Sequence, residues 1–192
     1  VVFPSGDYVS ILAGQEMLRP LQHELLPNLT NINPSILARL KHDPKCRYSV
    51  PFAVGSSLVA VNTRMHPQYE TSWKLFLQPD LMQRTTMLDD MREVIGAALK
   101  SIGYSVNSTN DRELEQAKHV VLSWKNNILK FDTETFAKSF ASGALYAVHC
   151  YPENIVQEYE TRRLETDVVF FVPREGGTMY VDSMCILAGT KR

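Results

Sequence analysis

Two carboxylates stand three residues apart where a helix is predicted to begin. Asp90 directly precedes residues 91–102 and Glu93 lies in their first turn. Apolar side chains recur at helical spacing in this segment. Side chains three positions apart lie near one another on the first turn, so this pair could hold an ammonium group. The same pattern is typical of a capping box, in which both carboxylates bind backbone N–H groups instead. The residues alone leave both interpretations open.

A tyrosine and an aspartate alternate along a predicted strand, residues 179–187. Because side chains two positions apart share one face of a strand, Tyr180 and Asp182 are expected to lie side by side. An aromatic ring beside a carboxylate suits an amine on a methylene chain, since the ring covers the carbon atoms and attracts the cation. The alternatives are a core tyrosine for Tyr180 and a structural salt bridge for Asp182.

Two further places could contribute to a ligand site. Tyr151 follows a predicted buried strand, residues 144–150, and ligands of open α/β sheets bind at such strand ends. Its alternative is again a half-buried core tyrosine. Ser5 and Asp7 lie in a loop after residues 1–3, which read as a strand, so hydroxyl and carboxylate could face a cleft. An ordinary turn has the same composition.

Catalytic and metal-binding patterns are weak. The five histidines have no HxxxH or HExxH spacing, and the three cysteines form no CxxC pair, so no metal site and no cofactor are expected. His149 and Cys150 are adjacent strand residues that point to opposite faces, which excludes a catalytic dyad. Glu175-Gly176-Gly177 lacks the spacing of a phosphate-binding loop. We therefore expect no enzyme.

Predicted strands and helices alternate along the chain, which indicates the α/β class. The helices are predicted at residues 8–15, 36–40, 73–76, 91–102, 111–125, 133–142 and 152–159. The strands are predicted at residues 1–3, 48–61, 83–88, 130–131, 144–150, 168–172 and 179–187. Pro51 and Gly55 interrupt the second of these strands, as expected where a strand passes between two sheets, so Gly55 is the candidate domain boundary.

Composition limits the classes of partner. The 20 basic and 21 acidic residues give a formal net charge of −1, so no broad positive field is present for nucleic acid. The apolar runs are shorter than the roughly 20 residues that a membrane helix needs. Both ends of the chain look like cuts inside a larger protein, so a membrane tether through a missing N-terminus stays open.

Several segments, in order along nearly the whole chain, resemble the spermidine/putrescine periplasmic binding proteins of ABC importers. The more specific segments are an Asp-Asp-x-Arg-Glu-Val element and a Glu-Gly-Gly-x-x-aromatic-x-Asp-Ser element. The matching segments are Phe3-Pro4-Ser5 with Tyr8-Val9, Tyr48-Ser49-Val50-Pro51-Phe52, Asp89 to Val94, Gly103-Tyr104-Ser105 with Asn107-Ser108-Thr109, and Pro173 to Gly177 running to Tyr180 through Ser183.

The resemblance implies the type II periplasmic-binding-protein fold, in which two lobes with mixed sheets close on a ligand about a hinge. On that template residues 1–54 belong to the first lobe, residues 55–181 form the second, and residues 182–192 return to the first. The chain would be a central fragment, without the first strand-helix unit and the C-terminal helices of the family.

The resemblance also implies a function and a site. The protein would be a periplasmic or other extracytoplasmic receptor that binds a polyamine and delivers it to the permease of an ABC transporter. Asp90, Glu93 and Asp182 would hold the amines, Tyr151 and Tyr180 would line the methylene chain, and Ser5 would contribute a hydroxyl. Familiar spermidine-binding members carry Trp at the two tyrosine positions and an aromatic residue at Asp7, so the choice between putrescine and spermidine stays open. The alternatives are another small cation, an amino acid, or a sensor for a partner receptor.

Overall fold

A computed structural model describes residues 1–165 and 167–191. The chain divides into two compact units. Unit 1 contains Val1–Gly55 and the chain from Met179 onward, and unit 2 contains Ser56–Thr178. The structure therefore places Gly55 and Met179 to Val181 in unit 1, whereas the family template places them in the second lobe. Gly55 pairs with Tyr180 at the end of the two-stranded sheet of unit 1, so this pairing holds both segments in that unit.

Unit 1 is built on an antiparallel pair of strands, β1 (Ser49–Gly55) and β7 (Tyr180–Cys185). The pairing runs from Ser49↔Cys185 to Gly55↔Tyr180, with a bulge between Pro51 and Ala53. Residues 1–3, predicted as a strand, contact β7 only through an isolated bridge between Val2 and Cys185. The helices of unit 1 are α1 (Gly6–Gly14), α2 (Pro34–Leu37) and the 3-10 helices η1 (His23–Leu25) and η2 (Pro27–Asn31).

Two small apolar clusters stabilise unit 1. Val9 of α1 packs with Leu18 and Cys185, and Leu40 packs with Cys46 and Val181. Asp43 anchors the loop that leads into β1, because its carboxylate accepts the backbone N–H groups of Arg47, Tyr48 and Ser49, each at 2.9 Å, and the hydroxyl of Ser49. Asp43 is only 6% exposed, so these bonds replace the water that burial removes.

Unit 2 contains a five-stranded sheet in the order β4-β3-β5-β2-β6. Strand β3 (Thr85–Met87) pairs in parallel with β4 (Lys130–Phe131) and β5 (Ala147–Cys150), whereas β2 (Leu58–Asn62) pairs antiparallel with β5 and β6 (Val168–Phe171). The helices are α3 (Met91–Ser101), α4 (Asp111–Lys125), α5 (Phe136–Ala141), α6 (Pro152–Arg162), and the 3-10 helices η3 (Trp73–Leu77) and η4 (Pro79–Leu81). Within the described residues, no helix has the length and apolar character required to span a membrane.

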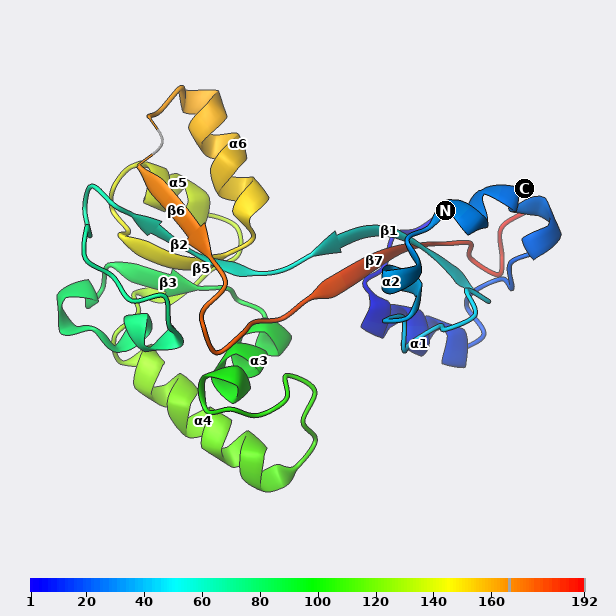
Figure 1. The fold of residues 1–192 in the computed structure, drawn as a ribbon, viewed down its shortest axis with the longest axis horizontal. Helices are drawn as coiled ribbons and strands as arrows, with labels where there is room; N and C mark the ends of the chain where they lie inside the picture. The colour runs from blue at the N-terminus through cyan, green and yellow to red at the C-terminus, as the bar shows by residue number, and fades with distance from the viewer. Residues whose placement is uncertain (166, 192) are drawn as a thin grey trace. The chain divides into compact units, whose positions relative to one another are not determined.

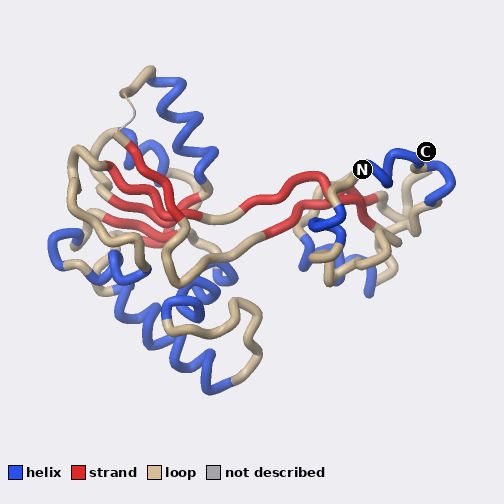
Figure 2. The backbone as a smooth tube through the Cα atoms, in the orientation of Figure 1, coloured by secondary structure: helices blue, strands red, loops and turns tan. Residues whose placement is uncertain are grey.

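Helices cover both faces of the sheet in unit 2 (Figures 1 and 2). On one face, Val59 and Val61 of β2 pack with residues of α3, α4 and η3 around Trp73 and Trp124. On the other face, Ala60 packs with residues of α5 and α6. Successive side chains of β2 therefore point to opposite faces, and both faces are apolar because helices cover both sides of the sheet. The α/β class and the helices α3, α4 and α6 are as predicted.

Candidate functional site

The carboxyl ends of the three parallel strands gather the unit 2 candidates at one edge of the sheet. Asp89 and Asp90 follow β3, Asp132 follows β4, and Tyr151 follows β5. Parallel strands end at the same edge, which is where open α/β sheets bind ligands. Tyr151 is the N-cap residue of α6, is partly buried, and packs against the apolar cluster under α5 and α6. The expected strand-end position of Tyr151 is confirmed.

Asp90 caps helix α3. Its Oδ1 atom accepts the backbone N–H groups of Arg92 at 2.9 Å and Glu93 at 3.2 Å. Both bonds use the same oxygen, and within the described residues no hydrogen bond to Oδ2 is present. Asp90 therefore fulfils the capping role and keeps one carboxylate oxygen for another partner.

Glu93 does not complete a capping box. Its side chain turns into unit 2, where Oε2 accepts the Ser57 hydroxyl at 2.5 Å and the Thr178 hydroxyl. The residue is 7% exposed. The capping-box interpretation is therefore wrong for Glu93, because two hydroxyl donors distant in sequence take the place of the Asp90 N–H group.

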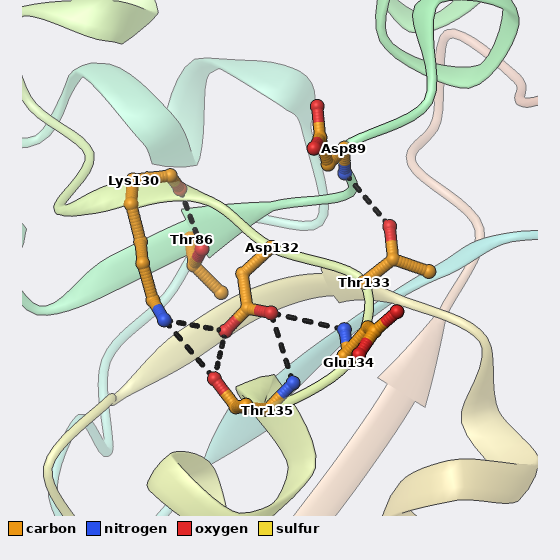
Figure 3. A network of polar contacts seen from close by, with 7 residues as sticks. All are labelled: Thr86, Asp89, Lys130, Asp132, Thr133, Glu134 and Thr135. Atoms are coloured by element: carbon orange, nitrogen blue, oxygen red, sulfur yellow. Dashed lines mark hydrogen bonds and ion pairs between the residues drawn. The ribbon is translucent and has the colours of Figure 1, made fainter.

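A network of polar contacts ties the loop after β4 to the end of β3 (Figure 3). Asp132 accepts the N–H groups of Glu134 and Thr135 at 2.9 Å and pairs with the Lys130 ammonium at 2.8 Å. Thr133 accepts the N–H of Asp89 at 2.9 Å, so this network fixes the backbone immediately before Asp90.

The balance of interactions keeps Asp132 ionised. Burial, the largest single influence, raises the pKa of Asp132, but hydrogen bonds from Lys130, from the Thr135 hydroxyl and from the Thr135 and Glu134 backbones together lower it to about 2. Asp132 is thus a structural carboxylate that already has its cation.

Unit 1 brings together a second set of candidates. Ser5 forms an isolated antiparallel bridge with Asp182, and the Ser183 N–H donates to the Pro4 carbonyl at 3.0 Å. The Ser5 hydroxyl donates to Oδ1 of Asp7 at 2.8 Å. Ser5 and Asp7 therefore lie at the start of α1 beside the strand that carries Asp182.

Tyr180 and Asp182 share the partly buried face of β7, as the alternation predicted. Val181, Ser183 and Cys185 form the buried face of the same strand. The Tyr180 ring lies against Gly55 of β1, since a Cβ atom built at Gly55 would lie 2.6 Å from Cε2 of Tyr180. Of the seven residues proposed for the site, four thus lie in unit 1, namely Ser5, Asp7, Tyr180 and Asp182, and three lie in unit 2, namely Asp90, Glu93 and Tyr151.

His149 and Cys150 point to opposite faces of the sheet, as expected. The Cys150 side chain lies in the cluster under α5 and α6, whereas His149 contacts Trp73 edge-on and Ser57 through Nε2. Burial lowers the pKa of His149 to about 3, so the ring is neutral.

In residues 1–165 and 167–191, no three His, Cys, Asp or Glu side chains are grouped so as to hold a metal ion.

Sequence reasoning missed Ser57, Thr178 and the Asp132 network. Ser57 and Thr178 carry no motif and lie 36 and 85 residues from Glu93, so only tertiary structure identifies them. Asp132 did carry a signal, because it directly precedes the helix predicted at residues 133–142 and aspartate is a favoured N-cap residue.

Comparison with known proteins gives one family for the whole chain. The family model described as bacterial extracellular solute-binding protein matches residues 1–192. The chain is 31% identical over 192 residues to spermidine/putrescine-binding periplasmic protein 1 of Haemophilus influenzae, covering 100% of this chain and 52% of the relative. It is 28% identical over 201 residues to the putrescine/cadaverine-binding protein of Pseudomonas aeruginosa, covering 100% and 56%. The chain thus spans about half the length of these curated relatives.

A solved structure shares the fold. The crystal structure of the TpPotD lipoprotein of Treponema pallidum superposes with a TM-score of 0.94 at 42% identity. The match covers 99% of this chain and 60% of that protein. The periplasmic-binding-protein fold expected from the sequence is therefore confirmed, as is the expectation that the chain represents part of it.

Proposed function

Because the chain belongs to the family of bacterial extracellular solute-binding proteins, we propose that it is the central part of an extracytoplasmic receptor for a linear polyamine. The receptor binds putrescine or spermidine and delivers it to the permease of an ABC importer. The names of the relatives support this substrate class, since they include spermidine/putrescine and putrescine/cadaverine binders. Members of such a family bind solutes and are not enzymes.

The observation that carries the proposal is the state of Glu93. Its carboxylate is almost fully buried, yet the partners that the structure gives it are neutral hydroxyls. Within the described residues, Glu93 forms no ion pair, whereas the buried Asp132 pairs with Lys130. A buried carboxylate without a cation is costly, so an ammonium group from a ligand would stabilise it.

The remaining candidates supply the other features that a polyamine needs. Asp90 keeps an oxygen beside the same helix start, and Asp182 supplies a carboxylate from unit 1. We assign Tyr151 and Tyr180 to the methylene chain, because aromatic faces cover carbon atoms and attract adjacent ammonium groups. Ser5 and Asp7 supply a hydroxyl and a further carboxylate at the start of α1.

The expected affinity follows from these contacts. A charged hydrogen bond contributes roughly 1.5 to 3 kcal/mol, so two or three of them with methylene burial give micromolar or tighter binding after association costs. Because we assign more than one carboxylate to the ligand, the ligand needs more than one amine. A monoamine of the same length should therefore bind far more weakly.

Titration calorimetry on the complete protein tests the proposal. Putrescine and spermidine should release heat with saturable binding, whereas 1-butylamine and 1,4-butanediol at the same concentrations should not. Asp182→Asn should weaken binding roughly tenfold or more, since it removes a charged partner. Asp111→Asn, at an exposed carboxylate in the first turn of α4, is the matched control. Binding of neutral amino acids in preference to diamines, or unchanged affinity in Asp182→Asn, would contradict the assignment.

A further inference from the structure

The Glu93 carboxylate, its two hydroxyl donors and the His149 ring form a cluster of four side chains in unit 2. Besides the two bonds to Oε2, the Ser57 hydroxyl oxygen lies 2.9 Å from Oγ1 of Thr178 and 2.9 Å from Nε2 of His149. Ser57 and His149 are fully or almost fully buried, at 1% and 0% exposed. The cluster therefore consists of one carboxylate, two hydroxyls and one imidazole, of which the Thr178 side chain is only partly buried.

The number of protons available determines how the cluster is connected. Each hydroxyl has one proton, and both donate it to Oε2 of Glu93. The Ser57 oxygen can then only accept, so His149 must carry its proton on Nε2 and donate it to Ser57. In this tautomer Nδ1 carries no proton and leaves no buried N–H group without an acceptor. Nδ1 has no hydrogen-bond partner among the described residues, which agrees with this assignment. The chain of donors runs from His149 through Ser57 to Glu93.

Packing fixes the Thr178 side chain in the orientation that donates. A Cβ atom built at Gly96 of α3 would lie 2.8 Å from Cγ2 of Thr178, so the methyl group rests on the helix where only glycine leaves room. With the methyl group on Gly96, the hydroxyl points to Glu93 on the previous turn of the same helix. The shape of α3 thus selects the rotamer of Thr178.

The position of the two hydroxyls in the chain is also informative. Ser57 is the second residue of unit 2 and Thr178 is its last, so the chain enters and leaves the unit at the Glu93 carboxylate. The Ser56 hydroxyl additionally donates to the Thr178 carbonyl. One carboxylate oxygen therefore holds both connecting segments, and Oε1 is the oxygen with no hydrogen bond within the described part of the chain.

We propose that Ser57 and Thr178, with His149 behind Ser57, are positioning residues that hold Oε2 of Glu93 and leave Oε1 for the ligand ammonium. This inference rests on the proposed function for the identity of the ligand, but not for the geometry. The three residues donate without charge, so they orient the carboxylate and do not neutralise it. A lysine or arginine in their place would compete with the ligand for Glu93.

The decisive comparison uses two substitutions at one position in the complete protein. Thr178→Val keeps the shape and removes the hydroxyl, whereas Thr178→Ser keeps the hydroxyl. Calorimetry with putrescine and spermidine should show roughly tenfold weaker binding for Thr178→Val, because a hydrogen bond to a charged group is lost, and restored binding for Thr178→Ser. Thr161→Val is the matched control, since the Thr161 hydroxyl donates to the Gln157 carbonyl on the exposed surface of α6.

A double-mutant cycle separates positioning from a general structural effect. In a Glu93→Gln background, Thr178→Val should cause little additional loss of affinity, because the group that it positions has already been changed. An equal loss in both backgrounds, or a loss in Thr178→Ser as large as in Thr178→Val, would overturn the inference. If Thr178→Val does not fold, Ser57→Ala removes the other donor and enters the same cycle.

A measurement without ligand keeps this inference distinct from the proposed function. In protein labelled with 13C at the glutamate carboxyl carbons, the Glu93 signal is assigned by its disappearance in Glu93→Gln. That signal should shift in Thr178→Val and return in Thr178→Ser. A signal unmoved by Thr178→Val overturns the positioning role. If the signal shifts but no polyamine binds to the unsubstituted protein, the proposed function fails and the positioning role stands.

Discussion

Gly55 and Tyr180 face each other at the end of the β1–β7 pair, and the ring of Tyr180 occupies the space where a Gly55 side chain would be. A Cβ atom there would lie 2.6 Å from Cε2 of the ring and nearer still to Cζ and the hydroxyl. Real Cβ atoms do not approach other heavy atoms so closely, so any side chain at Gly55 must displace the ring. The glycine therefore fixes the position of a residue that we assign to the ligand.

We expect Gly55→Ala to move Tyr180 and to weaken polyamine binding roughly tenfold, equivalent to about 1.4 kcal/mol. Calorimetry with putrescine and spermidine measures this effect. Gly14→Ala is the matched control, because no atom lies within 4 Å of a Cβ built at Gly14. Affinity equal in both variants would show that the ring does not take part in binding.

Substitutions of Asp90 should separate its two roles. Asparagine also caps helices well, so Asp90→Asn should keep the stability of unit 2 and lower polyamine affinity by removing the charge. Asp90→Ala should lower affinity and also cost about 1 kcal/mol of unfolding free energy, since the Arg92 and Glu93 N–H groups lose their acceptor. Urea denaturation and calorimetry on both variants provide the two readouts.

Helix α4 offers the corresponding control. Asn110 caps α4 through the N–H groups of Arg112 and Glu113, in the same geometry as Asp90 in α3. Asn110→Ala should therefore lower stability without changing polyamine affinity. A loss of affinity in Asn110→Ala as large as in Asp90→Ala would mean that helix stability, and not the Asp90 charge, controls binding.

Asp132 should stabilise unit 2 in a pH-dependent way. Its pKa in the folded state, about 2, lies below the ordinary value of 3.8, so the stabilisation is present above about pH 4 and is lost as the pH falls through 2. Asp132→Asn should lower the unfolding free energy at neutral pH by about 2 kcal/mol. The difference between the two proteins in urea denaturation should then shrink between pH 4 and pH 2.

An exposed ion pair is the control for Asp132. Glu115 pairs with Lys118 at 3.0 Å on the surface of α4, where solvent screens the interaction. Glu115→Gln should therefore change stability little at any pH. A difference between Asp132→Asn and the unsubstituted protein that stays constant down to pH 2 would contradict the role of the carboxylate charge.

The three cysteine thiols should be inert in the folded protein. All three are buried. Burial raises the pKa of Cys150 and Cys46, and raises that of Cys185 to about 11, with the nearby carboxylates Glu153 and Asp43 adding to the effect. A thiol reagent at pH 8 should modify no cysteine in the native protein and three in denaturant. Fast modification of any thiol in the native protein would contradict this, because it would show that the segments that bury the thiol open and expose it to solvent.

Local signals in the sequence predicted most of the elements. Helix α4 spans the predicted residues and begins at Asp111 because Asn110 caps it. Gly103, with a φ of +87°, follows the end of α3. Helix α5 starts at Phe136, three residues after its predicted start, because Asp132 takes the Glu134 and Thr135 N–H groups into a turn. A side chain just outside the helix thus decided where the helix begins.

The site was only partly predictable for a different reason. The face shared by Tyr180 and Asp182 follows from the strand period, and Tyr151 follows from the end of β5, so both could be read locally. The orientation of Glu93 depends on Ser57 and Thr178, which are distant from it in sequence and meet it only in the tertiary structure. Periodicity does not encode such long-range contacts.

The bulge in β1 decides which residue meets Tyr180. Pro51 pairs with Ser183 and Ala53 pairs with Asp182, so Phe52 is an extra residue that the partner strand does not match. If β1 paired without the bulge, Phe52 would pair with Asp182, and Val54 instead of Gly55 would pair with Tyr180. The isopropyl group of Val54 would then occupy the position that Gly55 leaves empty for the ring. A single unmatched residue thus lets the strand pairing bring the glycine, and not a branched side chain, to the aromatic ring.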